Sequence, residues 1–131
     1  MEAKVLIVED EPIVALEIEN ILRQAGFEIV GCVGSLNKAL AALKNTDCDL
    51  AILDANLRGD NAAPLAMALR ERGRPFLFVS GYERAYLPDA FLDVPLLPKP
   101  FEPSELITAV KQLLSAAHAI EDYSRSRPEP H

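Results

Sequence analysis

The N-terminal stretch KVLIVEDEP spans Lys4–Pro12 and contains a strand pattern, an acidic cluster and a helix start in direct succession. Its apolar part, up to Val8, is typical of a parallel strand that is covered on both faces. Three acidic residues follow, and Pro12 suits the first turn of a helix because its missing N–H needs no partner there. The stretch therefore predicts a buried strand that leads into a helix at an acidic edge of a sheet.

Four further short apolar runs are also predicted to be strands: Glu28–Val33, Leu50–Leu53, Phe76–Val79 and Val94–Leu97. Amphipathic helical patterns separate and follow the runs, and they begin near Pro12, Ser35, Pro64 and Pro103. The remaining connection, Tyr82–Asp93, has Pro88 in its middle, which predicts a short or irregular fourth helix. Strands that alternate with helices in this way predict an α/β protein with a parallel, doubly wound sheet.

The length and charge of the chain argue against several classes of protein. The chain has 131 residues, enough for one domain, which we place at residues 1–120. Residues 121–131 lack apolar periodicity and are expected to form a flexible tail. A net charge of −7 argues against nucleic-acid binding, and no apolar run approaches the length of a membrane span. Cys32 and Cys48 have no metal-ligand spacing and are expected to be reduced thiols of a cytoplasmic protein.

Polar side chains follow four of the five predicted strands. Glu9 and Asp10 follow the first strand, Asp54 the third, Ser80 the fourth, and Lys99 comes shortly after the fifth. Because the carboxyl ends of parallel strands meet at one edge of a sheet, we expect these side chains to lie together. Mg²⁺ commonly binds one or two carboxylates together with water and phosphate. A carboxylate beside Mg²⁺ can attack phosphorus, and an ammonium and a hydroxyl can hold the phosphoryl oxygens.

With these residues in this order, the sequence resembles a response-regulator receiver domain of the CheY type over residues 3 to about 118. The resemblance rests on four motifs: VEDEP (Val8–Pro12), DLAILDANL (Asp49–Leu57), VSG (Val79–Gly81) and KPF (Lys99–Phe101). It implies a flavodoxin-like fold in which the five strands have the order 2-1-3-4-5 and five helices flank the sheet.

The resemblance implies that Asp54 accepts a phosphoryl group from a histidine kinase. Ser80 and Lys99 would bind the oxygens of that group, and the Lys99–Pro100 peptide bond would be cis. Such a protein, part of a two-component or phosphorelay system, is a phosphoacceptor switch and not an enzyme. Its own chemistry would be limited to self-catalysed phosphotransfer and slow autodephosphorylation.

The resemblance also implies a magnesium site. Asp10, Asp54 and the backbone carbonyl of Asn56 would bind Mg²⁺, and Glu9 would contribute through a water molecule. The family more often has aspartate at the position of Glu9, so the longer side chain reaches further towards the metal. Two other departures are Ser80 for the more frequent threonine and Arg58 for the usual proline.

Two positions are expected to modify the switch. Leu96 occupies the place of the family's switching Tyr or Phe, so the common aromatic rotation is not available. The stretch FLFVSGY (Phe76–Tyr82) resembles the FAT GUY subgroup of receivers, whose members lack that aromatic, are often single-domain and are associated with HWE-type histidine kinases. Tyr82 is expected to shield the acyl phosphate, and Tyr82–Asp93 to change order on phosphorylation. Output would pass to a downstream protein or phosphotransfer partner.

Two other functions could use the same residues. A receiver-like binding module that is not phosphorylated would be expected to lack one of the acids or the lysine, and this chain has them all. A phosphatase of the haloacid-dehalogenase type needs a second acid two residues after the nucleophile, where this chain has Asn56. The sequence therefore favours a stand-alone, phosphorylated response regulator.

Overall fold

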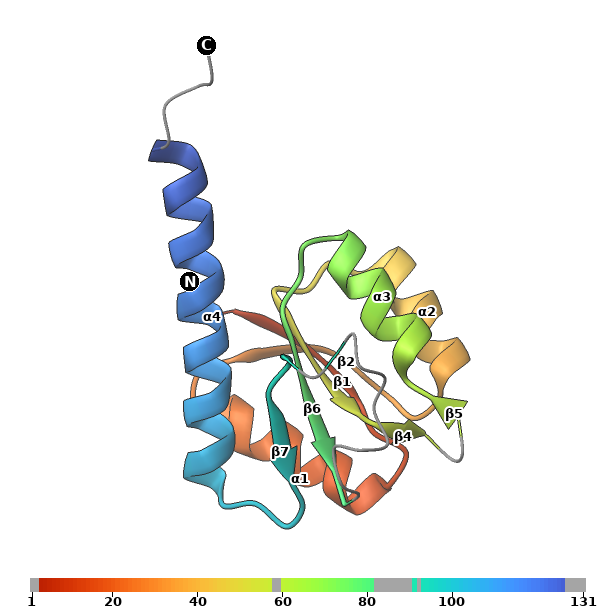
Figure 1. Cartoon of the computed structure of the whole chain (residues 1–131). Coiled ribbons are helices and arrows are strands. Elements are labelled where there is room, and N and C mark those ends of the chain that lie inside the picture. Colours follow the sequence, from red (N-terminus) through yellow and green to blue (C-terminus); the bar gives the residue numbers. More distant parts are fainter. Residues whose placement is uncertain (1–2, 58–59, 82–90, 92, 127–131) are drawn as a thin grey trace.

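The computed structural model describes residues 3–57, 60–81, 91 and 93–126 of the chain. Its main sheet is parallel and has five strands, in the order β2-β1-β3-β6-β7 (Figure 1). The strands are β1 (Lys4–Val8), β2 (Glu28–Val33), β3 (Leu50–Asp54), β6 (Phe76–Ser80) and β7 (Leu96–Pro98). In chain order this is 2-1-3-4-5, so the predicted topology is confirmed.

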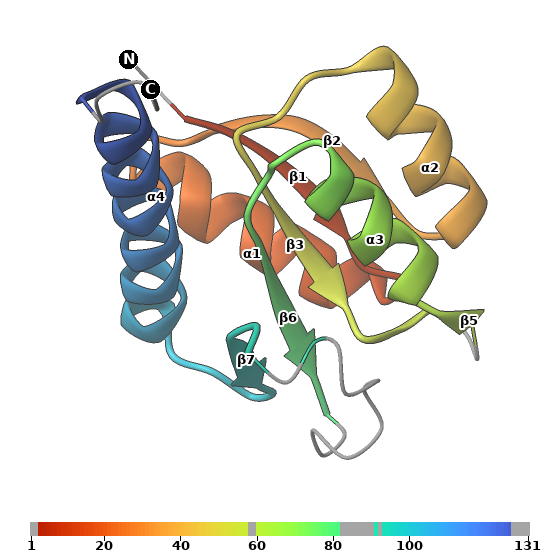
Figure 2. The ribbon, with the colours of Figure 1, turned by 45° about the horizontal axis from the view of Figure 1, so that its top comes forward.

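Helices cover both faces of this sheet. They are α1 (Pro12–Gln24), α2 (Leu36–Asn45), α3 (Ala63–Glu71) and α4 (Pro103–Ser126). Figure 2 shows α2 and α3 on one side of the sheet and α1 and α4 on the other. The starts predicted from Pro12, Ser35 and Pro103 are confirmed, and the Ser35 hydroxyl accepts a hydrogen bond of 3.2 Å from the Lys38 backbone N–H.

The apolar runs of the central strands are explained by two separate cores. In β1, Leu6 and Val8 pack in the core beneath α2 and α3, while Val5 and Ile7 pack in the core beneath α1 and α4. All five residues of β3 are buried as well. A strand with a core on each face needs apolar side chains at every position, which is why neither run alternates with polar residues.

The last strand, β7, begins two residues later and ends one residue later than the predicted run Val94–Leu97. Val94 instead donates a backbone hydrogen bond of 3.1 Å to the Phe91 carbonyl, so the strand begins only at Leu96. The Lys99 N–H donates to the Ser80 carbonyl on β6 at 2.9 Å. Because successive N–H groups of a strand point to opposite sides, the nitrogen of Pro98 faces the open edge of the sheet, where no donor is needed.

The structure contains one ladder that was not predicted, and one predicted helix falls almost wholly outside the described residues. Asn56–Leu57 (β4) and Asp60–Asn61 (β5) form a small antiparallel ladder that the sequence did not predict. Four helices lie in the described residues, whereas the fourth of the five expected helices, with Tyr82 and Pro88, falls almost wholly outside them.

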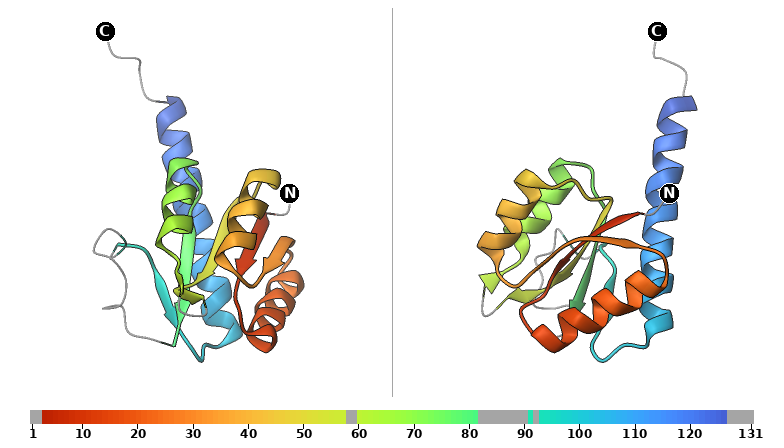
Figure 3. Two further views of the ribbon diagram at one scale, coloured as in Figure 1. Left: turned by 90° about the vertical axis from the view of Figure 1, so that its right-hand side faces the viewer. Right: turned by 180° about the vertical axis from the view of Figure 1, so that it is seen from behind.

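Helix α4 runs to Ser126, beyond the boundary expected after residue 120, and Figure 3 shows its C-terminal end extending past the rest of the domain. The flexible tail expected at residues 121–131 remains a prediction. Among the described residues, none of the helices has both the length and the apolar composition that a membrane crossing requires.

Gly31 provides a test of how tightly β1 and β2 pack against each other. A β-carbon at Gly31 would lie 2.9 Å from Cδ1 of Leu6, which is buried. We expect Gly31→Ala to lower the free energy of unfolding by about 1–3 kcal/mol, because the core must shift to accept the methyl group. The measurement is urea denaturation. Gly81→Ala is the control, since no heavy atom lies within 4 Å of its added β-carbon, and an equal loss in both variants would contradict the packing argument.

Candidate functional site

The candidate site lies at the edge where the parallel strands end. Figure 2 shows β3 and β6 pointing towards this edge. Glu9 follows β1, Asp54 is the last residue of β3, and Ser80 is the last residue of β6. These three are the buried polar residues of the described part of the chain, and as whole residues they are 3%, 4% and 1% exposed. Polar groups are rarely buried unless they are paired or functional, so their collection at one edge marks it as a site.

Lys99 brings the positive charge to this edge. Its Nζ lies 2.7 Å from Oε1 of Glu9, 3.3 Å from Oδ2 of Asp54 and 3.3 Å from Oε1 of Glu11. Lys99 directly follows β7, and its backbone N–H is fixed by the hydrogen bond to the Ser80 carbonyl of β6. The Lys99–Pro100 peptide bond is cis, as the resemblance implied. The structure therefore brings Lys99, Glu9 and Asp54 together as the sequence predicted.

Four carboxylates form one cluster at this edge. Glu9, Asp10, Glu11 and Asp54 each offer an oxygen, and these oxygens all lie within 4.8 Å of one another. The sequence places Glu11 among the three acidic residues before Pro12 but does not single it out as a site residue, so its place in the cluster comes from the structure. The one available signal was its position directly after Glu9 and Asp10.

The electrostatics of the cluster disfavour full ionisation. The pKa of Glu9 is raised from 4.5 to about 7: burial contributes most to the rise and the hydrogen bond with Asp54 adds to it, while Lys99 and the Glu11 N–H act in the opposite direction. Burial lowers the pKa of Lys99, but the hydrogen bond with Glu9 and the charge of Asp54 outweigh this, so the net shift is upwards. One ammonium thus only partly offsets the negative charge.

Of the remaining residues that the sequence singled out, the structure places two and leaves two outside the described residues. Asn56 belongs to β4, two residues after Asp54 in the chain. Leu96 begins β7, where it pairs with Phe78 and packs against the buried core. Tyr82 and Arg58 lie outside the described residues.

The chemistry of the cluster fits a hard divalent cation. All of its ligand atoms are carboxylate oxygens, and two of its members, Glu9 and Asp54, are nearly withdrawn from water. Mg²⁺ takes oxygen ligands and would neutralise charge that Lys99 alone leaves in excess. Asp10 and Asp54 would hold the ion directly, with Glu9 acting through water.

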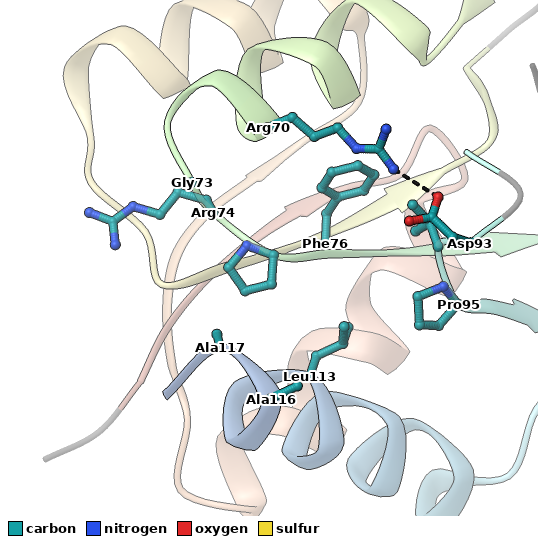
Figure 4. Close-up of a pocket in the computed structure, with 11 residues that line it drawn as sticks. Arg70, Gly73, Arg74, Phe76, Asp93, Pro95, Leu113, Ala116 and Ala117 are labelled. Atoms are coloured by element: carbon teal, nitrogen blue, oxygen red, sulfur yellow. Dashed lines mark hydrogen bonds and ion pairs between the residues drawn. The ribbon is translucent and has the colours of Figure 1, made fainter. Parts of the chain in front are cut away.

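A cavity lies at the opposite edge of the sheet from the carboxylate cluster, near the start of β6 (Figure 4). It has a volume of about 450 Å³ and a mainly apolar lining that includes Phe76, Pro95 and Leu113. Arg70 closes one side, where it forms an ion pair of 2.9 Å with Asp93. The cavity shares no residue with the carboxylate cluster.

Comparisons with known proteins agree with this fold. The family described as "Response regulator receiver domain" matches residues 5–111, and the chain belongs to this family. The chain is 38% identical to SdrG from Sphingomonas melonis Fr1, whose solution structure it matches with a TM-score of 0.74 over 88% of this chain and 96% of that one. It is 31% identical to a response regulator receiver protein from Sinorhizobium medicae WSM419, with a TM-score of 0.77 over 88% and 97% of the two chains.

Longer relatives contain a similar region. The transcriptional regulatory protein PdtaR from Mycobacterium tuberculosis is 29% identical over 116 residues, which is 86% of this chain and 57% of PdtaR. The chain spans about half the length of the curated relatives it matches: 57% of PdtaR, and 51% of both the DNA-binding response regulator MtrA from Mycolicibacterium smegmatis and the TorCAD operon transcriptional regulatory protein TorR from Escherichia coli.

The raised pKa of Glu9 predicts a pH-dependent stability. A folded-state pKa above the unfolded value means that the proton of Glu9 stabilises the fold below about pH 4.5, and that this contribution is lost as the pH rises through about 7. Glu9→Gln stays neutral at every pH. Without Mg²⁺, the free energy of unfolding of this variant minus that of wild type should therefore increase by on the order of 1–3 kcal/mol from about pH 5 to about pH 8. Urea denaturation at the two pH values measures this.

The control for this prediction is Glu17→Gln, which removes the same charge from an exposed position on α1. Its difference from wild type should not change with pH in the same way. Saturating Mg²⁺ should reduce the effect at Glu9, because a bound cation favours ionised carboxylates. A pH-independent difference between Glu9→Gln and wild type would contradict the burial argument.

Proposed function

We propose that the protein is a phosphoacceptor switch in which Asp54 receives a phosphoryl group from a histidine kinase. The observation that carries this proposal is the contact of the buried Asp54 carboxylate with Lys99 inside a cluster of four carboxylates. Membership of the receiver family supports the general class of function, and these residues support the phosphoryl-transfer chemistry. The protein would act in the cytoplasm, where a histidine kinase phosphorylates it and a downstream protein receives the signal.

Each side chain has a distinct task in the proposed reaction. An oxygen of Asp54 forms a bond to phosphorus, and the bond from phosphorus to the kinase histidine breaks, with its electron pair leaving on the imidazole nitrogen. The Lys99 ammonium and the Ser80 hydroxyl would hold the transferred oxygens. Bound Mg²⁺ would offset charge on the phosphoryl group. Lys99 and Asp54 are already in contact, so little rearrangement is needed to place the ammonium.

The proposed output is recognition by a protein partner or onward transfer of the phosphoryl group. Leu96 packs against the core at the start of β7, and it has no ring that could rotate between two states. The switch therefore has to use another part of the molecule than the family's common aromatic. An HWE-type kinase remains the proposed phosphodonor, on the FAT GUY resemblance of Phe76–Tyr82.

The alternatives make different demands on the site. A haloacid-dehalogenase-type phosphatase is disfavoured by membership of the receiver family and by Asn56 in the place of the general acid. A module that binds partners without phosphorylation would not need Lys99 beside a buried Asp54. The contact at 3.3 Å therefore favours the phosphorylated switch.

Intact mass spectrometry tests the proposal. Incubation with acetyl phosphate and Mg²⁺ should add one phosphoryl group to wild type and none to Asp54→Ala, because the nucleophile is lost. Asp49→Ala is the matched control: Asp49 lies just before the other end of β3, and its carboxylate accepts a hydrogen bond from the Lys4 N–H. Phosphorylation of Asp54→Ala, or none of wild type, would exclude the assignment.

A further inference from the structure

Glu11 occupies a position for which helix capping gives no explanation. It is the N-cap residue of α1, with extended backbone angles, yet its side chain makes no capping hydrogen bond. An N-cap side chain normally accepts a hydrogen bond from the first turn of its helix. Instead, the Glu11 backbone N–H donates to Oε2 of Glu9 at 3.1 Å, and the Glu11 side chain turns to Lys99.

The contact of Glu11 with Lys99 lies on the solvent-exposed side of the site, which is called the mouth of the site below. Glu11 has a side chain that is 63% exposed, while the side chains of the other two carboxylates on Lys99 are 0% (Glu9) and 6% (Asp54) exposed. The lysine side chain itself is only 16% exposed. Glu9 and Asp54 are held in the protein interior, so Glu11 is the member of the three that can move away from the ammonium into water.

We propose that Glu11 is a positioning residue that competes with the phosphoryl group for Lys99 and lowers the reactivity of the site towards highly charged phosphodonors. This inference rests on the proposed function, because it concerns the same Asp54 and Lys99. The Glu11 carboxylate holds the ammonium in the unphosphorylated protein, and it must yield when phosphoryl oxygens arrive on Asp54.

Two physical effects follow from one exposed charge. First, the ammonium has three donors, and its contacts with Glu9, Asp54 and Glu11 already engage it before any phosphoryl oxygen is present. Second, a carboxylate at the mouth repels an incoming anion, and the repulsion grows with the charge of that anion. Both effects disfavour a dianionic donor more than a donor with a smaller net charge.

Two small donors separate these effects from a general change in the protein. Acetyl phosphate carries more net negative charge at neutral pH than phosphoramidate does. With either donor, an Asp54 oxygen forms the bond to phosphorus. The bond that breaks is P–O in acetyl phosphate, with acetate leaving, or P–N in phosphoramidate, where the nitrogen is already protonated and leaves as ammonia.

The experiment compares the rates at which Asp54 is phosphorylated in wild type and Glu11→Gln at saturating Mg²⁺, by intact mass. We expect Glu11→Gln to react about threefold to tenfold faster with acetyl phosphate and to gain less with phosphoramidate. The gain should shrink at high salt, because ions screen an exposed charge. A purely structural role of Glu11 would change both donors alike and would not depend on salt.

Glu17→Gln is the matched control, since it removes one exposed carboxylate from the same helix and should react as wild type does. Equal rates for Glu11→Gln and wild type, while wild type is phosphorylated on Asp54, would overturn the role of Glu11 alone. No phosphorylation of wild type by either donor would overturn the proposed function and this inference with it. Equal gains in the Glu11 and Glu17 variants would assign the effect to net charge and overturn the proposal.

Discussion

The contact of one ammonium with two buried carboxylates is the interaction on which this site depends. Glu9 and Asp54 are almost fully withdrawn from water, and an isolated buried charge is strongly unfavourable. Lys99 compensates them at 2.7 and 3.3 Å, and removing it would leave the carboxylates buried without that partner. The three residues belong to segments far apart in the chain, so the fold has to hold these segments together before the charges can pair.

The sheet brings those segments together because the strands that carry them lie next to one another or one strand apart. β1 and β3 lie side by side and end at the same edge, which places Glu9 next to Asp54. β6 separates β3 from β7, and its last residue, Ser80, holds the Lys99 backbone through a hydrogen bond of 2.9 Å. A functional group at the end of a strand is held in place more precisely than one on a loop without such support. The lysine therefore reaches Asp54 across one intervening strand.

The charge balance of the site explains its expected chemistry. Four carboxylate groups converge within 4.8 Å, and the described contacts bring one lysine to them. The deficit is partly relieved by the raised pKa of Glu9, and a divalent cation could relieve the rest. A phosphoryl group would add negative charge to the same place, so the switch depends on how Lys99 and a cation are shared. Glu11 takes part in that sharing although it lies on the surface.

The sequence alone determined the order of strands and helices and the edge where the polar residues meet, and it placed Asp54, Asp10 and Lys99 at that edge. These features follow from local patterns: continuous apolar runs mark strands buried on both faces, and acids at their ends face the same edge. The start of β7 at Leu96 could not be predicted, because the turn of Val94 onto Phe91 overrides its apolar pattern. The contact of Glu11 with Lys99 also needed the tertiary structure, since the two residues lie 88 positions apart in the chain and only the folded sheet brings their side chains within 3.3 Å.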